Sequence, residues 1–401
     1  MTELLSPAGS LKNMRYALAY GADAVYAGQP RYSLRVRNNE FNHLDVMADA
    51  IAETHRQGKQ FYIASNISPH NDKIRSYLKD MAPVIEMKPD ALIMSDPGLI
   101  MMVREKWPEM PIHLSVQANA VNYATVRFWH QQGIVRTILS RELGLEEVEE
   151  IRQRVPEMEL EVFVHGALCI AYSGPTKTWE PEKPDSHDEV EPMMLLEEQG
   201  RPGEMMPAFE DEHGTYIMNS KDLRAVQHVE KLIAMGVHSL KIEGRTKSHY
   251  YVARTAQVYR RAIDHALAGK PFDMSLMAEL DHLANRGYTE GFYRRHVPQE
   301  YQNYEQGVSG NPNQQFVGEI CGVERDKGWF TVDVKNRFEA GDTLELITPQ
   351  GNMTFSLDAL ENRDGVKINA APGSGHVVRI PMPADLPLPE DGGYAMLMRY
   401  M

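Results

Sequence analysis

Cysteine is scarce in this sequence, with only Cys169 and Cys321 among 401 residues. Two cysteines cannot build the disulfide framework that is typical of small secreted proteins, and there is no CxxC or paired His/Cys spacing to indicate a self-contained metal site. No apolar run approaches the roughly 20 residues that a membrane-spanning helix needs. The amino-terminal MTELLSPAG lacks the basic and apolar regions of a signal peptide. We therefore expect a cytoplasmic protein without a membrane partner.

Positive charge is also in short supply, since the formal net charge is −14. Much of the acidic excess lies in residues 175–212, which contain twelve acidic residues, three basic residues and six prolines, without clear periodicity. This composition predicts a mobile acidic insertion. The net charge of the whole chain therefore says little about what the folded part binds, and it does not exclude nucleic acid.

Outside the insertion, short apolar runs alternate with longer amphipathic segments. Eight strands are predicted at residues 3–5, 24–26, 61–64, 91–94, 112–115, 137–139, 160–164 and 239–242. Helices are predicted between them, at residues 11–20, 74–87, 123–132 and 145–154. Eight such units predict an α/β fold, a TIM-like (β/α)8 barrel over residues 1–272, with an open doubly wound sheet as the main alternative.

The pattern changes near residue 312. Short strands are predicted at residues 316–323, 329–334, 343–348, 353–356 and 376–380, separated by turn sequences such as DKG and PQG. They predict a small all-β barrel domain over residues 313–401. Residues 273–312 are predicted to bridge the two domains, with helix near residues 276–286.

In a barrel of this kind the active site lies at the carboxyl ends of the strands. The residues that follow the predicted strands are rich in amides, hydroxyls and charged groups. They include Tyr26, Asn66, Gln117, Arg141, His165, Cys169, Glu243 and Arg245. This collection suits a polar, anionic ligand better than an apolar one.

Several of these candidates also have a purely structural interpretation. A lone cysteine such as Cys169 is more often a buried small side chain than a ligand. Glu243 and Arg245 could simply form an ion pair with each other. His165 lies four residues from Cys169, which would allow a Cys–His nucleophile, but this spacing does not establish hydrogen-bond geometry.

A basic loop with an aromatic residue follows the second predicted strand. It contains Arg31, Tyr32, Arg35 and Arg37, and further basic residues lie later in the chain at Lys247, Arg260, Arg261, Arg294 and Arg295. These residues could contact the phosphates of a nucleic acid. A solvated surface would explain each cluster equally well.

Longer stretches of the sequence resemble a known family. Residues 161–174, EVFVHGALCIAYSG, resemble the signature of the collagenase-like U-type peptidases. The stretches ELLSPAGSLKNMRYALAYGADAVYAGQPRYSLRVRNNEF, HLSVQANAVN and LKIEGRTKSHYYVARTAQVYR resemble the branch of that family that hydroxylates RNA. The likeness covers nearly the whole chain. It implies an enzyme that forms 5-hydroxyuridine at the wobble position of tRNA in a prephenate-dependent reaction.

The implied reaction suggests roles for the candidate residues. Arg245 and Arg141 are expected to bind the two carboxylates of prephenate, because guanidinium groups match carboxylates in a forked geometry. Glu243, His165 and Gln117 are the candidates for the catalytic step. The remaining predicted substrate contacts are Asn66, Tyr26, Arg35 and Arg37, and the basic loop and the β domain are expected to hold the anticodon arm.

Two other functions remain open from the sequence. One is a protease, as the older family name says, although no Ser–His–Asp set, HExxH motif or carboxylate dyad is evident. The other is a non-catalytic RNA-binding factor.

The sequence departs from the family at one place. After the position of Gly174 the family signature continues with an arginine, a second cysteine and a serine, and two more cysteines follow. In the family these cysteines hold an iron–sulfur cluster together with the one that corresponds to Cys169. Here Gly174 is followed by PTKTWEPEKPDSHDEVE. Either this protein has no cluster or the sequence omits a segment; omission is favoured, because such losses concentrate in mobile loops. Cys169 would then be the first ligand of a four-cysteine metal site.

Overall fold

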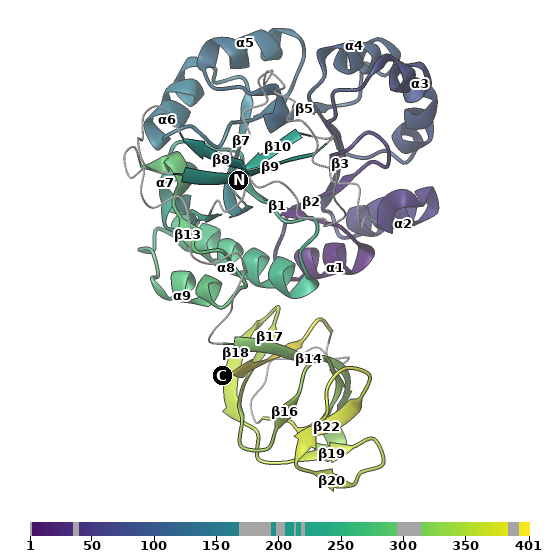
Figure 1. The fold of residues 1–401 in the computed structure, drawn as a ribbon, viewed down its shortest axis with the longest axis vertical. Coiled ribbons are helices and arrows are strands. Elements are labelled where there is room, and N and C mark those ends of the chain that lie inside the picture. Colours follow the sequence, from purple (N-terminus) through teal and green to yellow (C-terminus); the bar gives the residue numbers. More distant parts are fainter. Residues whose placement is uncertain are drawn as a thin grey trace, which may run out of the picture.

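The fold comprises a helix-covered barrel and a smaller β domain (Figure 1). The computed structural model describes residues 2–34, 40–167, 221–294, 314–383 and 393–401, together with the backbone of strands at 194–197, 205–211 and 214–217. Among these residues, no helix is both long and apolar enough to cross a membrane.

Eight parallel strands form the barrel. They are β1 (Glu3–Pro7), β2 (Ala24–Gly28), β3 (Gln60–Ser65), β4 (Ala91–Met94), β5 (Ile112–Leu114), β6 (Arg136–Ile138), β7 (Glu159–Ala167) and β12 (Ser239–Ile242). Each strand pairs with the next, and β12 pairs with both β7 and β1, which closes the barrel. The prediction of a closed barrel with its eighth strand at residues 239–242 is therefore confirmed, and the open sheet is excluded.

Helices surround the strands. They are α1 (Leu11–Ala19), α2 (Leu44–Arg56), α3 (Asn71–Glu86), α4 (Pro97–Lys106), α5 (Tyr123–Gln131), α6 (Leu145–Arg154), α7 (Val229–Ala234), α8 (His249–Leu267) and α9 (Ser275–Asp281). In α8 the buried residues Val252, Ala256, Tyr259 and Ile263 recur at the spacing of one helical face. Ser248 begins this helix by accepting a hydrogen bond from the Tyr251 amide. Helix α8 thereby packs against β1, α1 and α7.

The barrel interior contains charged as well as apolar side chains. Arg136 donates hydrogen bonds to Glu3 at 2.6 Å and Glu159 at 2.9 Å, and lies 3.4 Å from Glu161. Lys241 Nζ donates to the other carboxylate oxygen of Glu161 at 2.7 Å. Glu161 contacts both cations, so these residues form one ion-pair network. Pairing of this kind makes buried charges tolerable. The network runs along the barrel axis from the amino-terminal face inward.

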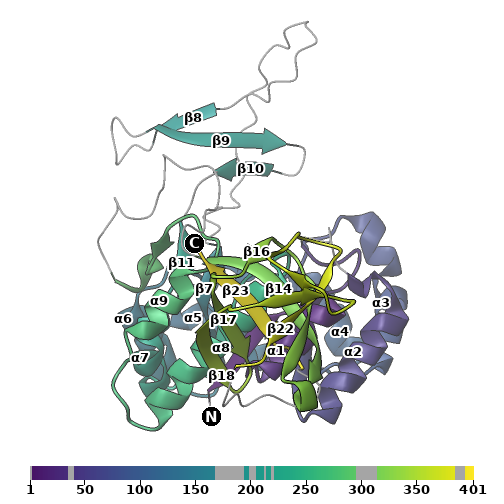
Figure 2. The same cartoon turned by 90° about the horizontal axis from the view of Figure 1, so that it is seen from below.

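The acidic insertion contains regular structure. Strands β8 (Met194–Glu197), β9 (Met205–Asp211) and β10 (Gly214–Ile217) form an antiparallel sheet. This sheet lies in the chain between β7 and β11 (Asp222–Arg224), and Figure 2 shows it as a separate layer beyond the barrel. The strands lie within the segment that was predicted as a mobile insertion because it lacks clear periodicity. Apolar runs such as MMLL and TYIM supply residues that favour strands, despite the surrounding acids.

The carboxyl-terminal domain is an antiparallel sheet. Its strands are β14 (Gln314–Glu324), β15 (Trp329–Val334), β17 (Thr343–Thr348), β18 (Gly351–Ser356), β19 (Leu360–Asn362), β20 (Lys367–Ile368), β22 (Val377–Pro381) and β23 (Met396–Tyr400), with a separate pair β16 (Phe338–Glu339) and β21 (Ala370–Ala371). Phe330, Val332, Leu344 and Leu346 are among the residues of its core. The predicted β domain is confirmed.

Buried and half-buried ion pairs join the two domains. Arg254 of α8, which is 1% exposed, lies 3.0 Å from both carboxylate oxygens of Glu345 on β17 and 3.5 Å from Glu279 of α9. On β14, Glu319 accepts a hydrogen bond from Lys12 of α1 at 2.7 Å and lies 3.0 Å from His249 of α8. The position of the β domain on the barrel is therefore fixed partly by charge.

Glu319 should make this contact sensitive to acid. Burial alone would raise the pKa of Glu319, but hydrogen bonds and charges from His249 and Lys12 outweigh it and lower the pKa to about 2, from a usual value of 4.5. A lowered pKa means that the carboxylate stabilises the fold above pH 4.5 and that this contribution is lost as the pH falls toward 2.

We expect the unfolding free energy of the wild-type protein to fall more steeply over this pH interval than that of Glu319→Gln. Urea denaturation at a series of pH values measures both slopes. Glu149→Gln, on the exposed face of α6, is the matched control and should behave like the wild type. If the unfolding free energies of the wild type and Glu319→Gln fall equally with pH, the proposed contribution of Glu319 is contradicted.

Candidate active site at the carboxyl end of the barrel

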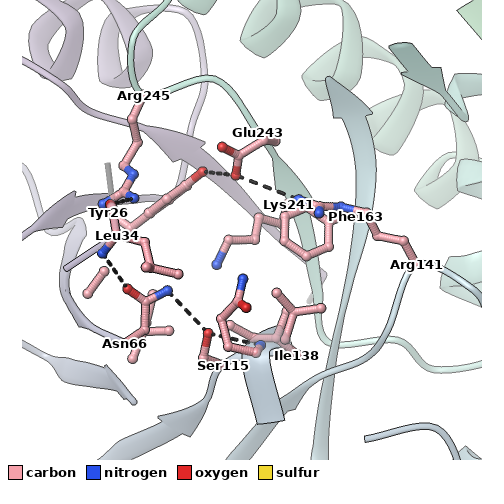
Figure 3. Close-up of a pocket in the computed structure, with 14 residues that line it drawn as sticks. Tyr26, Leu34, Asn66, Ser115, Ile138, Arg141, Phe163, Lys241, Glu243 and Arg245 are labelled. Atoms are coloured by element: carbon pink, nitrogen blue, oxygen red, sulfur yellow. Dashed lines mark hydrogen bonds and ion pairs between the residues drawn. The ribbon is translucent and has the colours of Figure 1, made fainter. Parts of the chain in front are cut away.

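A polar cavity lies at the carboxyl ends of the barrel strands (Figure 3). It has a volume of about 90 Å³ and opens to solvent. Six residues predicted from the sequence line it: Tyr26, Asn66, Gln117, Arg141, Glu243 and Arg245. They come from β2 and from the segments after β3, β5, β6 and β12. The closed barrel thus brings together residues that are far apart in the sequence.

One side of the cavity carries linked amide and hydroxyl groups. Asn66 accepts a hydrogen bond from the Leu34 amide at 3.3 Å and donates one to Ser115 Oγ at 3.3 Å. Ser115 in turn accepts from the backbone amide of Gln117 at 3.4 Å, at the start of a short helix, Val116–Ala118. The carboxamide of Gln117 has no hydrogen-bond partner among the described residues, so it is available to a ligand.

The opposite side carries a tyrosine, a carboxylate and an arginine. Tyr26 Oη donates to Glu243 Oε2 at 3.0 Å, and Arg141 Nη2 lies 3.8 Å from the same oxygen. Burial, followed by the nearby Glu243 charge, holds the pKa of Tyr26 well above its usual range. Tyr26 therefore stays protonated and acts as a donor. The Arg141 guanidinium also lies 3.8 Å from the centroid of the Phe163 ring, which orients it by a cation–π contact.

Arg245 connects the cavity to the loop after β2. Its Nη1 donates to Ser33 Oγ at 2.7 Å and its Nη2 donates to the carbonyl oxygen of Leu34. This approach requires glycine at position 28, because a Cβ on Gly28 would lie 2.6 Å from Arg245 Nη1. The Nε of Arg245 is buried and has no hydrogen-bond partner in the described part of the chain. Arg245 therefore lines the cavity and also holds this loop in place.

His165 does not line the cavity, contrary to the prediction from the sequence. The pairing of β12 with β7 shifts by one residue, so that Lys241 pairs with Phe163 and Ile242 pairs with His165. A bulge of this kind interrupts the alternation of side chains along a strand. Phe163 therefore points into the barrel, while His165 is directed away from the cavity.

His165 is instead enclosed by three tyrosines. The ring centroids of Tyr251, Tyr259 and Tyr288 lie 5.7, 5.6 and 5.5 Å from that of the histidine, and Tyr259 Oη is 3.4 Å from His165 Nδ1. Burial is the main cause that lowers the pKa of His165 to about 3. The imidazole is therefore neutral and 1% exposed. The prediction that His165 faces the same cavity as Gln117 and Glu243 is therefore wrong.

The predicted phosphate contacts are mostly engaged within the chain. Arg31 lies 2.7 Å from Asp80, Arg261 lies 2.6 Å from Glu279, and Arg260 lies 3.0 Å from Asp23. For these three arginines the structure favours ion pairs within the chain over contacts to phosphates. Arg35, Arg37, Arg295 and the predicted metal ligand Cys169 lie outside the described residues.

The cysteines do not fit an iron–sulfur cluster held by four cysteines of one chain. Cys321 is exposed on β14 of the carboxyl-terminal domain and contacts the carbonyl oxygen of Thr331. Cys169 is the other cysteine of the sequence, and two cysteines are fewer than the four thiolates that such clusters take. In the described part of the chain, no group of three or more His, Cys, Asp and Glu residues is arranged to hold a metal ion.

Lys241 and Phe163 are among the cavity residues that were not predicted from the sequence. Both lie within strands, whereas the prediction considered residues that follow the strands. The sequence does contain an indication for Lys241, because Lys241, Glu243 and Arg245 occupy every second position of KIEGR, residues 241–245. Residues two apart on a strand face the same side, so the lysine was to be expected beneath the glutamate.

Comparison with known proteins gives family matches over most of the chain. Residues 9–303 match the family described as Peptidase family U32, and residues 312–399 match the Peptidase family U32 C-terminal domain. The tRNA hydroxylation protein P of Escherichia coli (strain K12) is 59% identical over 442 residues, covering 99% of this chain and 96% of that protein. The tRNA hydroxylation protein P1 of Bacillus subtilis (strain 168) is 31% identical over 394 residues, covering 92% and 89%.

Among solved structures, a U32 peptidase is similar with a TM-score of 0.35 and 18% identity, covering 42% of this chain and 70% of that one. The alignment with the Escherichia coli relative is longer than this chain. It spans 442 positions, which exceeds the 401 residues of this chain by 41. That relative therefore carries residues that have no counterpart here.

Proposed function

Because the chain belongs to peptidase family U32 and resembles relatives named for tRNA hydroxylation over nearly its full length, we propose that it is an enzyme that hydroxylates tRNA. We propose further that the product is 5-hydroxyuridine at the wobble position and that prephenate is the co-substrate. The observation that carries this proposal is the set of six polar residues that meet in one cavity at the carboxyl end of the barrel.

Each side of the cavity has a part in the proposed reaction. Arg141 and Arg245 would bind carboxylate groups of prephenate, since both guanidinium groups line the cavity. The free carboxamide of Gln117, supported by Asn66, would bind the polar edge of the uracil ring. A wobble base lies in a single-stranded loop, so it can enter such a cavity at a low cost in unstacking. Glu243, the carboxylate among the described residues of the cavity, would accept or donate a proton at the bound substrate.

The basic loop that Arg245 holds and the carboxyl-terminal β domain would contact the anticodon arm. Support for the loop is its position, because Ser33 and Leu34 are hydrogen-bonded to a residue of the cavity. No step of this proposal uses an iron–sulfur cluster, since the cysteines of the chain do not fit one.

The test is nucleoside analysis of tRNA by mass spectrometry. A strain that lacks the gene should lose 5-hydroxyuridine, and the wild-type protein should restore it only when the cells make or receive prephenate. Restoration without prephenate would contradict the proposal that prephenate is the co-substrate. A different modified nucleoside would contradict the proposed position on uridine, while leaving tRNA modification in place.

Arg245→Ala is expected to weaken prephenate binding by about 1.5–3 kcal/mol, the range for a hydrogen bond to a charged group. This corresponds to roughly 10- to 150-fold in Kd. Isothermal titration calorimetry measures the change. Arg260→Ala, on α8 outside the cavity, is the matched control and should bind prephenate as the wild type does. An unchanged affinity in Arg245→Ala would exclude this arginine as a ligand contact.

A further inference from the structure

Lys241 lies at the floor of the cavity, below the residues that the sequence predicted. Its Nζ is 2.7 Å from Glu161 Oε1, 4.3 Å from the centroid of the Tyr26 ring and 5.6 Å from that of Phe163. Figure 3 shows its ammonium group directed into the space between these two rings, toward Asn66 and Ser115. The residue is 3% exposed, so any ligand group that reaches it must enter the cavity.

The ion pair with Glu161 leaves part of this ammonium group unused. A lysine has three N–H donors, and among the described residues Glu161 is the hydrogen-bond partner of Lys241. The negative charge of Glu161 is itself shared, because its second oxygen lies 3.4 Å from Arg136. An N–H group directed into a cavity without an acceptor is unfavourable. A ligand oxygen at the floor would satisfy it.

The aromatic rings connect Lys241 to the two arginines of the cavity. Tyr26 lies between Lys241 and Arg245, whose guanidinium is 6.0 Å from the ring centroid. Phe163 lies between Lys241 and Arg141. Three cations therefore surround the cavity, and Glu243 is the one carboxylate among the described residues that line it. This excess of positive charge suits a ligand with two anionic groups.

We propose that Lys241 binds one carboxylate of a dicarboxylate ligand at the floor of the cavity, while the second carboxylate contacts the arginines at the rim. Lys241 thereby determines the preference for a dicarboxylate over a monocarboxylate. The inference rests on the proposed function, because it specifies how the same cavity recognises its co-substrate. A purely structural ion pair with Glu161 would instead affect stability without affecting this preference.

The experiment compares two acids that differ in the number of carboxylates: prephenate has two and phenylpyruvate has one. Lys241→Met alone leaves Glu161 buried without its partner, which can prevent folding. The double variant Lys241→Met/Glu161→Gln removes both charges and is the main test. Lys270→Met, at an exposed position beyond α8, is the matched control.

We expect the folded double variant to bind prephenate at least about tenfold more weakly, as for the loss of one charged hydrogen bond, and to bind phenylpyruvate as the wild type does. The ratio of the two affinities, measured by calorimetry, should therefore fall about tenfold. The Lys270→Met control should keep the wild-type ratio. Lys241→Arg, which keeps the charge, should retain more of the preference than the double variant.

An unchanged ratio in the folded double variant would overturn the inference and leave the proposed function intact, provided that Arg245→Ala still weakens prephenate binding. If the wild-type protein binds neither acid, the inference fails together with the proposed co-substrate. Restoration of 5-hydroxyuridine in the deletion strain tests tRNA hydroxylation separately. If the double variant loses the affinity ratio and the wild-type protein does not restore 5-hydroxyuridine, the inference is supported and the proposed reaction is contradicted.

Discussion

Glu243→Gln should lower the rate of tRNA hydroxylation by about 10²- to 10⁴-fold, the range for loss of a general acid or base. Glu243 is the one carboxylate among the described residues of the cavity, and it accepts a hydrogen bond from Tyr26. Glutamine preserves the shape and an oxygen acceptor for the tyrosine, so the fold should be retained. What is lost is the ability to accept a proton from the substrate.

The rate is measured by nucleoside mass spectrometry of tRNA incubated with purified protein, and thermal unfolding checks the fold. Tyr26→Phe removes the donor to Glu243 without removing the carboxylate, so we expect it to retain much more activity. Glu149→Gln, on the surface of α6, should match the wild type. A Glu243→Gln protein with activity within tenfold of the wild type would exclude Glu243 from proton transfer.

Arg254→Met should destabilise the protein by about 3–5 kcal/mol, the range for a buried ion pair that loses one partner. The substitution removes the arginine from the Glu345 carboxylate, which is 5% exposed and also accepts a hydrogen bond from Gln314 at 2.7 Å. Methionine fills most of the volume of the arginine stem, so the effect comes mainly from charge. Urea denaturation measures the loss.

The double variant Arg254→Met/Glu345→Met provides the decisive comparison. Because it removes both buried charges, it should be more stable than Arg254→Met alone. Lys327→Met, which breaks an exposed pair with Glu324, should cost at most about 1 kcal/mol. A double variant that is less stable than the single one would show that packing of the stems, rather than the unpaired charge, accounts for the loss.

The barrel could be predicted because its strands are buried on both faces. Parallel strands of this kind are short apolar runs, and ALIM at β4 is recognisable without other information. The two- and three-residue strands β19, β20 and β21 were not predicted, since so few residues contain no periodicity. In the insertion, acids and prolines obscured the apolar runs of β8 to β10.

Residues of the site could be predicted where they directly follow a predicted strand. Asn66, Gln117 and Glu243 lie where a closed barrel must place them. His165 was misplaced because one extra residue in β7 reverses the side that it faces, and such a bulge has only a weak sequence signal. The pairing of Lys241 with Glu161 depends on register between strands, which the sequence does not specify.

The closure of the barrel by β12 has a consequence for biosynthesis. Ser239 of β12 pairs with Glu3 of β1, so the edge of β1 that does not pair with β2 has no partner until most of the barrel has been translated. At about 5–20 residues per second this interval is on the order of 10–50 s. During it, β1 and, once it has been translated, β7 present unpaired edges on which strands of other nascent chains could dock. The acidic insertion precedes β12 in the chain, and its repulsive charge emerges from the ribosome while those edges are still open. The same segment therefore lengthens the interval before the barrel can close.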